Sequence, residues 1–250
     1  MTSERKTALV TGASYGLGAA TALALARAGF DVVVTATAME NLTATLKALA
    51  ALEVRTLPLA LDLRAPSAIA AALADITAAF GGLDVLVNNA GSNLRKLAVD
   101  VTQAEWRDMI EVNVTGTFLL TQAFGRELIS RGAPGAVVNV ASTHGLIGAP
   151  ERSTYGIAKG AIIQMTRMLA VEWARHGVRV NAVAPGRLET ASPSRAGAEA
   201  KYMAAMLERI PLHRLATAEE VAAAIAYLAS PAAQSVTGQV LVLDGGLTVA

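Results

Sequence analysis

Three polar side chains in the second half of the chain have the types and spacing needed for acid–base chemistry. Tyr155 and Lys159 are four residues apart, which on a helix places both side chains on one face. A positive charge beside a phenol stabilises the phenolate, so Lys159 is expected to lower the Tyr155 pKa from its ordinary value near ~10. Ser142 ends an apolar run thirteen residues before Tyr155. The pattern predicts proton transfer to or from a reacting oxygen.

A glycine-rich turn, TGASYGLG, follows the first apolar run of the chain. Gly12, Gly16 and Gly18 would let the backbone approach a pyrophosphate at the N-terminus of a helix, which predicts dinucleotide binding. The same letters spell G-x-S-x-G around Ser14, which is the nucleophile elbow of serine hydrolases, and three histidines follow as candidate bases. Its position argues against the hydrolase, because that elbow normally comes after several strands.

The elements that must position these residues alternate along the chain. Longer alanine- and leucine-rich segments separate the apolar runs, and Thr102 and Thr217 each begin a capping box. Strands without polar alternation are buried on both faces, which predicts one α/β domain over 1–250, a doubly wound parallel sheet with helices on both faces. A segment at 187–210 fits no strand and is expected to be a substrate lid. Seven short β-branched runs predict the strands: 7–10, 31–35, 54–61, 84–88, 135–142, 178–184 and 239–243.

The composition narrows the function classes. The chain has 250 residues, of which 53% are hydrophobic and 16% charged, and its formal net charge is +1, so nucleic acid is not an expected partner. It has no cysteine and three histidines without metal-ligand spacing, which predicts neither a metal site nor disulfides. Neither a signal peptide nor a membrane span is indicated, so we expect a cytoplasmic protein.

Further motifs add to these residues, namely NNAG at 88–91, Asn113 in EVNVTG, and NAVAPGRLET at 181–190. In order and spacing, the whole set resembles the short-chain dehydrogenase/reductase family over nearly the full chain. The resemblance implies a seven-stranded Rossmann fold that binds NAD(P) and a ketone–alcohol interconversion. Its catalytic residues would be Asn113, Ser142, Tyr155 and Lys159. Tyr155 would exchange the proton, Ser142 would bind the carbonyl oxygen, and Asn113 would position a water beside Lys159.

The resemblance also implies which residues bind the cofactor. No acidic residue follows the second predicted strand before Glu40, and Thr37 stands where an acid would accept from an NAD ribose, so NADP(H) is favoured over NAD(H). Tyr15 replaces the basic residue that often accompanies NADP. The implied residues are Gly12, Ser14, Tyr15, Gly16, Leu17 and Gly18 around the pyrophosphate, Thr37 at the ribose, Asp62 and Leu63 at the adenine, Asn89 and Gly91 at the adenosine ribose, Tyr155 and Lys159, and Leu188 and Thr190 at the nicotinamide.

Substrate and assembly are the least defined by sequence. The TATA run after the second strand is similar to 3-oxoacyl-(acyl-carrier-protein) reductases. NNAGSNLRK looks like sugar-acid and polyol dehydrogenases that would use NAD, and there Arg95 and Lys96 could meet a carboxylate. A nucleotide-sensing protein without catalysis is a further alternative, although it would not need Ser142. In similar proteins the helices around 102–130 and 154–176 pair into homodimers and homotetramers, so we expect a homotetramer or homodimer.

Overall fold

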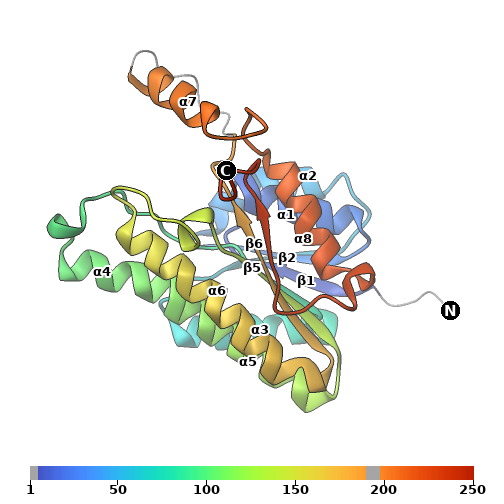
Figure 1. Ribbon diagram of the computed structural model, residues 1–250. Helices are drawn as coiled ribbons and strands as arrows, with labels where there is room; N and C mark the ends of the chain where they lie inside the picture. The colour runs from blue at the N-terminus through green and yellow to red at the C-terminus, as the bar shows by residue number, and fades with distance from the viewer. Residues whose placement is uncertain (1–4, 190–197) are drawn as a thin grey trace.

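All seven predicted strands are present in the computed structural model, which describes residues 5–189 and 198–250 (Figure 1). They form a single sheet with the order β3-β2-β1-β4-β5-β6-β7, and every neighbouring pair is parallel. The predicted doubly wound α/β architecture is confirmed. The strands are β1 Thr7–Val10, β2 Asp31–Ala36, β3 Thr56–Ala60, β4 Val85–Asn88, β5 Gly135–Val140, β6 Val178–Pro185 and β7 Val240–Leu243.

Helices cover both faces of the sheet, as Figure 1 shows with α3, α5 and α6 on one side and α1 and α8 on the other. Each helix layer encloses its own apolar core. The helices are α1 Gly16–Arg27, α2 Thr43–Leu49, α3 Pro66–Phe80, α4 Gln103–Ile110, α5 Thr117–Arg131, α6 Ser153–Trp173, α7 Ala198–Glu208 and α8 Ala218–Ala229.

Strand β1 shows why the apolar runs are continuous. Ala8 and Val10 point into the core beneath α1 and α8, whereas Leu9 points into the opposite core with Phe124 of α5. All of these side chains are fully buried. Successive strand residues face opposite sides, so a strand covered by helices on both sides needs apolar residues at every position. The loops at the strand ends are therefore where polar chemistry can be placed.

Both predicted capping boxes are confirmed. The Thr102 hydroxyl accepts from the Glu105 backbone N–H at the start of α4, and Thr217 does the same for Glu220 at the start of α8. The segment expected to be a lid has a helix of its own, α7, and Leu188 pairs with Ala216 as an isolated bridge. No helix in the described ranges combines the length and apolarity that a bilayer crossing requires.

Candidate active site

A cavity of about 430 Å³ opens at the carboxyl ends of β1 and β4. These strands are neighbours, but the chain leaves β1 toward β2 and leaves β4 toward β5, so the strand order reverses between them. In open α/β sheets this reversal leaves a crevice for a ligand. The lining includes eleven of the residues expected to bind the cofactor: Gly12, Ser14, Tyr15, Gly16, Leu17, Gly18, Thr37, Asp62, Leu63, Asn89 and Gly91.

The glycine-rich turn is packed too closely for larger side chains. A Cβ on Gly18 would lie 2.2 Å from the Gly12 carbonyl oxygen, and a Cβ on Gly12 would lie 2.9 Å from Ala90 Cα. Gly12 also has a φ of +64°, which L residues with side chains rarely adopt. The turn leads into α1, whose first backbone N–H groups have no partners within the helix. This geometry suits an anionic pyrophosphate.

Asn89 holds this turn in place. Its side-chain amide donates to the carbonyl oxygens of Thr11 and Gly12, both at 2.9 Å. The Thr11 hydroxyl in turn accepts from the backbone N–H groups of Asn89 and Ala90. Asn89 lines the cavity, and these contacts show that its amide also braces the glycine-rich turn against the end of β4.

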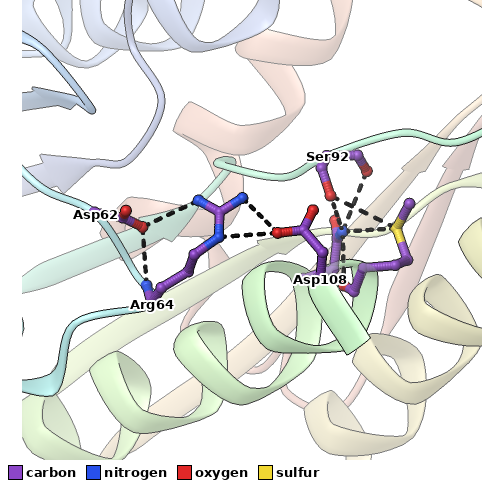
Figure 2. Close-up of polar contacts among 6 residues, drawn as sticks. Asp62, Arg64, Ser92 and Asp108 are labelled. Atoms are coloured by element: carbon purple, nitrogen blue, oxygen red, sulfur yellow. Dashed lines mark hydrogen bonds and ion pairs between the residues drawn. The ribbon is translucent and has the colours of Figure 1, made fainter. Parts of the chain in front are cut away.

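The wall of the cavity also carries an ion-paired arginine, which was not predicted from the sequence. Figure 2 shows Arg64 between Asp62 and Asp108, and its guanidinium lies 3.2 Å and 2.8 Å from their carboxylates. These carboxylates hold the pKa of Arg64 above its ordinary value. Leu63 beside it is buried in the core under α3 and α5. Asp62 therefore enters the cavity wall as a paired carboxylate.

A second cavity, of about 270 Å³, continues from the first and shares Leu17, Asn89, Gly91 and Ser92 with it. It brings together all four residues expected to be catalytic, although they come from three separate elements: the turn that carries Asn113, the end of β5, and α6. Leu188 also lines it, whereas Thr190, the other residue expected at the nicotinamide, lies outside the described residues. The four are Asn113, Ser142, Tyr155 and Lys159.

The electrostatics of Tyr155 differ from the sequence expectation. The Lys159 Nζ lies 5.7 Å from the centre of the Tyr155 ring, so the two side chains do share a helix face. Burial nevertheless raises the pKa of Tyr155, and the opposing influences are a hydrogen bond with Ser142 and the charge of Arg152. The expected net lowering of the Tyr155 pKa is wrong for this arrangement, because burial has the largest effect and Lys159 is not among the groups that lower this pKa. Lys159 is buried as well, and burial lowers its own pKa to about 8. Its ammonium donates to the Val140 carbonyl at 2.7 Å.

Asn113 lies on a π-helical turn, Glu111–Gly116, rather than within a continuous α-helix as expected. Its Nδ2 lies 3.0 Å from the Met109 carbonyl oxygen, the acceptor that the Asn113 backbone N–H would use in an α-helix. The side-chain amide therefore occupies the acceptor that a regular α-helix would give to the backbone N–H. The Oδ1 of Asn113 is buried and has no hydrogen-bond partner among the described residues. It faces Gly91 near Lys159, where a bound water or ligand group would satisfy it.

Several residues in or beside the two cavities carried no sequence signal of their own. Asn41 and Ser92 line the first cavity, and Asn93 lines the second. His144 follows Ser142 so closely that the two share a hydrogen bond. Position beside a recognised motif is the one signal that could have found Ser92, Asn93 and His144.

The two basic residues expected to meet a substrate carboxylate are already paired. Arg95 Nε lies 2.5 Å from the Glu151 carboxylate, and Lys96 Nζ lies 2.9 Å from the carboxylate of Glu105.

The described residues contain no cluster of three potential metal ligands. None of the hydrogen bonds among them joins Ser14 to a histidine side chain.

Comparison with known proteins defines the class. A family model described as "Enoyl-(Acyl carrier protein) reductase" matches residues 12–248. The chain is 43% identical over 244 residues to cis-4-hydroxycyclohexanecarboxylate dehydrogenase from Sinomonas cyclohexanicum, covering 97% of this chain and 96% of that one. It is 39% identical over 247 residues to a 3-oxoacyl-[acyl-carrier-protein] reductase from Vibrio cholerae, covering 99% of both.

A solved structure gives the same result. The NADP-bound crystal structure of a protein provisionally identified as a 2-deoxy-D-gluconate 3-dehydrogenase from Agrobacterium tumefaciens superposes with a TM-score of 0.91. The identity is 38%, and the match covers 99% of this chain and 98% of that one. The fold is that of a Rossmann-type nucleotide-dependent oxidoreductase.

The chain belongs to the short-chain dehydrogenase/reductase family. As a member it is an NAD(P)-dependent oxidoreductase acting on alcohol and carbonyl groups. This assignment excludes the serine hydrolase and the nucleotide sensor without catalysis as readings of the glycine-rich turn.

Proposed function

We propose that this protein interconverts a ketone and a secondary alcohol with NADP(H) as the favoured cofactor and Tyr155 as the acid and base. The observation that carries the proposal is the convergence of Asn113, Ser142, Tyr155 and Lys159 on one cavity that continues into the cleft beside the glycine-rich turn. A dinucleotide has the extent to reach from one cavity into the other. The close packing of Gly12 and Gly18 fits its pyrophosphate.

The side chains of this cavity divide the reaction between them. When bound, the reduced nicotinamide supplies the hydride that no side chain can supply. Ser142 donates a hydrogen bond to the carbonyl oxygen, and Tyr155 gives that oxygen its proton as the carbon gains the hydride, which yields the secondary alcohol. Burial raises the pKa of Tyr155, so the hydroxyl keeps its proton at neutral pH. Lys159 and Asn113 would return a proton to Tyr155 from solvent.

The preference for NADP(H) is supported by the end of β2. Thr37 and Asn41 line the cavity there, and both are neutral. The one carboxylate among the residues that line this cavity belongs to Asp62, which is paired with Arg64. A carboxylate facing the ribose would repel the 2′-phosphate of NADP, and this wall presents none at β2. NAD(H) is the alternative.

Hydroxy acids and keto acids are the second candidate substrates, beside 3-oxoacyl thioesters. Two of the relatives carry names that specify an acid, a hydroxycyclohexanecarboxylate and a deoxygluconate. A sugar-acid or polyol dehydrogenase that uses NAD is the corresponding alternative function. A lid role for 187–210 stays a prediction, as does a cytoplasmic location.

We also propose that copies of this chain pair through α5 and α6 to give a homodimer or homotetramer. These helices border an apolar groove of about 520 Å³ that includes Phe118 and Met168, whose exposed fractions are 39% and 53%. Val171 on α6 is exposed as well. A continuous apolar surface on two long helices suits a self-complementary contact.

The test combines nucleotide binding with turnover. Fluorescence titration with NADPH and NADH is expected to show binding with NADPH favoured, followed by oxidation of NADPH when cyclic ketones, keto acids and 3-oxoacyl thioesters are added. Tyr155→Phe is expected to bind NADPH as the wild type does and to lose about 10²–10⁴-fold in kcat, because general acid catalysis contributes that much. Near-normal kcat in this variant would contradict the role of Tyr155.

A further inference from the structure

Two loops at the mouth of the second cavity are clasped to each other. One follows β4 and the other precedes α6. Arg95 pairs with the Glu151 carboxylate at 2.5 Å, the Lys96 backbone N–H donates to the Glu151 carbonyl at 3.0 Å, and Arg152 Nη1 donates to Asn93 Oδ1 at 2.6 Å. Glu151 has a φ of +61°, which costs energy for a residue with a side chain. We use the name rim clasp for these five residues.

The rim clasp leaves one cation with a neutral partner. Arg95 pairs with Glu151 and Lys96 with Glu105, so those charges are balanced. The recorded side-chain partner of Arg152 is the amide oxygen of Asn93, and no ion pair is recorded for it within residues 5–189 and 198–250. A guanidinium has five donors, of which one bond to an amide oxygen uses one. Arg152 therefore retains both its charge and most of its donors.

Arg152 lies next to the cavity that contains the reacting groups. Asn93, which it contacts, lines the same cavity as Ser142 and Tyr155. Arg152 also immediately precedes α6, the helix that carries Tyr155 in its first turn. Its charge opposes the rise that burial gives the Tyr155 pKa, and it adds to the lowering that burial gives the His144 pKa, so its field reaches both side chains.

His144 lies beside both residues that carry the catalytic hydroxyls, and the charge of Arg152 affects its pKa. Its ring is edge-on to the Tyr155 ring with centroids 6.0 Å apart, and its Nδ1 lies 3.4 Å from the Ser142 hydroxyl. Burial is the main cause that lowers the His144 pKa. The imidazole is therefore neutral at pH 7 and adds no second charge to this wall.

We propose that Arg152 is the specificity-determining residue that binds a carboxylate of the substrate, so that the protein acts on keto acids and the corresponding hydroxy acids. The proposal rests on the ketone–alcohol activity proposed above. Arginine suits this role because its planar fork matches both oxygens of a carboxylate. The carboxylate would be separated from the reacting carbon by a ring or chain that spans from the rim to Tyr155 and Ser142.

The test compares an acid with its neutral ester. The probes are 4-oxocyclohexanecarboxylate and its methyl ester, with NADPH consumption as the readout, in the wild type, Arg152→Gln and Arg152→Lys. The matched control is Arg27→Gln, an exposed arginine in the last turn of α1. We expect the wild type to prefer the acid. In Arg152→Gln, kcat/KM for the acid should fall about 10- to 100-fold while that for the ester changes less than about twofold.

The Lys variant should recover part of the acid activity, because it keeps the charge but loses the fork. An equal fall for acid and ester would mean that Arg152 supports the loop rather than binding the substrate, and would overturn the inference. Ketone reduction without preference for the acid would also overturn it while leaving the proposed function intact. If no ketone of the wider panel is reduced despite NADPH binding, the proposed function itself fails. NADPH affinity and thermal unfolding of each variant verify that the fold is kept.

Discussion

Lys159 lowers the stability of the folded state, but the proposed reaction requires it. It is buried against β5, with its ammonium bonded to the Val140 carbonyl, and no carboxylate is recorded as its partner among the described residues. Burial without a counter-charge is what lowers its pKa to about 8. Residues held in this way for function are those whose replacement tends to stabilise a protein.

We expect Lys159→Met to abolish turnover but to raise stability at pH 7. The folded-state pKa of about 8 lies below the ordinary 10.5, so the unfolded chain binds more protons between these values. The wild type therefore gains stability as pH rises through that window, from a penalty of about 3 kcal/mol at pH 7 to under about 1 kcal/mol at pH 10. Loss of the bond to Val140 offsets about 1 kcal/mol of the gain.

Urea unfolding of both proteins at pH 7 and pH 10 measures this difference. The advantage of the Met variant should shrink at pH 10. Lys47→Met, on the exposed side of α2, provides the control and should show no such pH dependence. A Met variant less stable than the wild type at pH 7 would show that the buried charge is compensated.

At the scale of elements, the turn between β1 and α1 depends on close packing of backbone against backbone. Gly18→Ala would place a Cβ 2.2 Å from the Gly12 carbonyl oxygen and 2.6 Å from Asn89 Nδ2. We expect it to cost about 1–3 kcal/mol and to weaken NADPH binding, since the turn must shift. Gly160→Ala on α6 is the matched control, because its nearest neighbour would be an oxygen at 3.7 Å.

The control variant should be neutral or stabilising by up to ~1 kcal/mol, as expected for alanine in a helix interior. Thermal unfolding and NADPH titration distinguish the two glycines. Equal stability of both variants would mean that the turn can shift to admit a Cβ at little cost in free energy.

How much the sequence predicts also differs between elements. The seven strands and both capping boxes are local signals, in apolar runs and in Thr-x-x-Glu spacing, and each was predicted correctly. At the π-helical turn, the Asn113 side chain bonds to Met109 and to Ser92, which lies on another loop. Sequence periodicity carries no sign of these bonds and predicts an ordinary α-helix there.

Ion pairing is the main part of the site that the sequence did not predict. Arg95 looked available for substrate because its partner, Glu151, is fifty-six residues away in the chain. The raised pKa of Tyr155 follows from burial by several elements at once, which no spacing motif encodes. Contacts between distant loops require the tertiary fold.

For the whole molecule, the exposed apolar side of α5 and α6 predicts association. Met168→Glu would place a charge beside the groove that also contains Phe118, and burying it in a subunit contact would be costly. We expect light scattering after size-exclusion chromatography to show a dimer or tetramer for the wild type and a smaller species for this variant. Met39→Glu, an exposed methionine outside α5 and α6, should leave the mass unchanged. A monomeric wild type would contradict the proposed pairing.

The rim clasp has a consequence for how substrate range could be exchanged between relatives. Its contacts link the loop after β4 with the loop before α6, so each loop carries only half of the interaction. Grafting the second loop alone onto a related scaffold would bring Glu151 without Arg95, and Arg152 without Asn93. Transferring the substrate preference of this chain to a relative should therefore require both loops together. A chimera that carries only one of them should still fold, but its rim-clasp residues should lose their orientation.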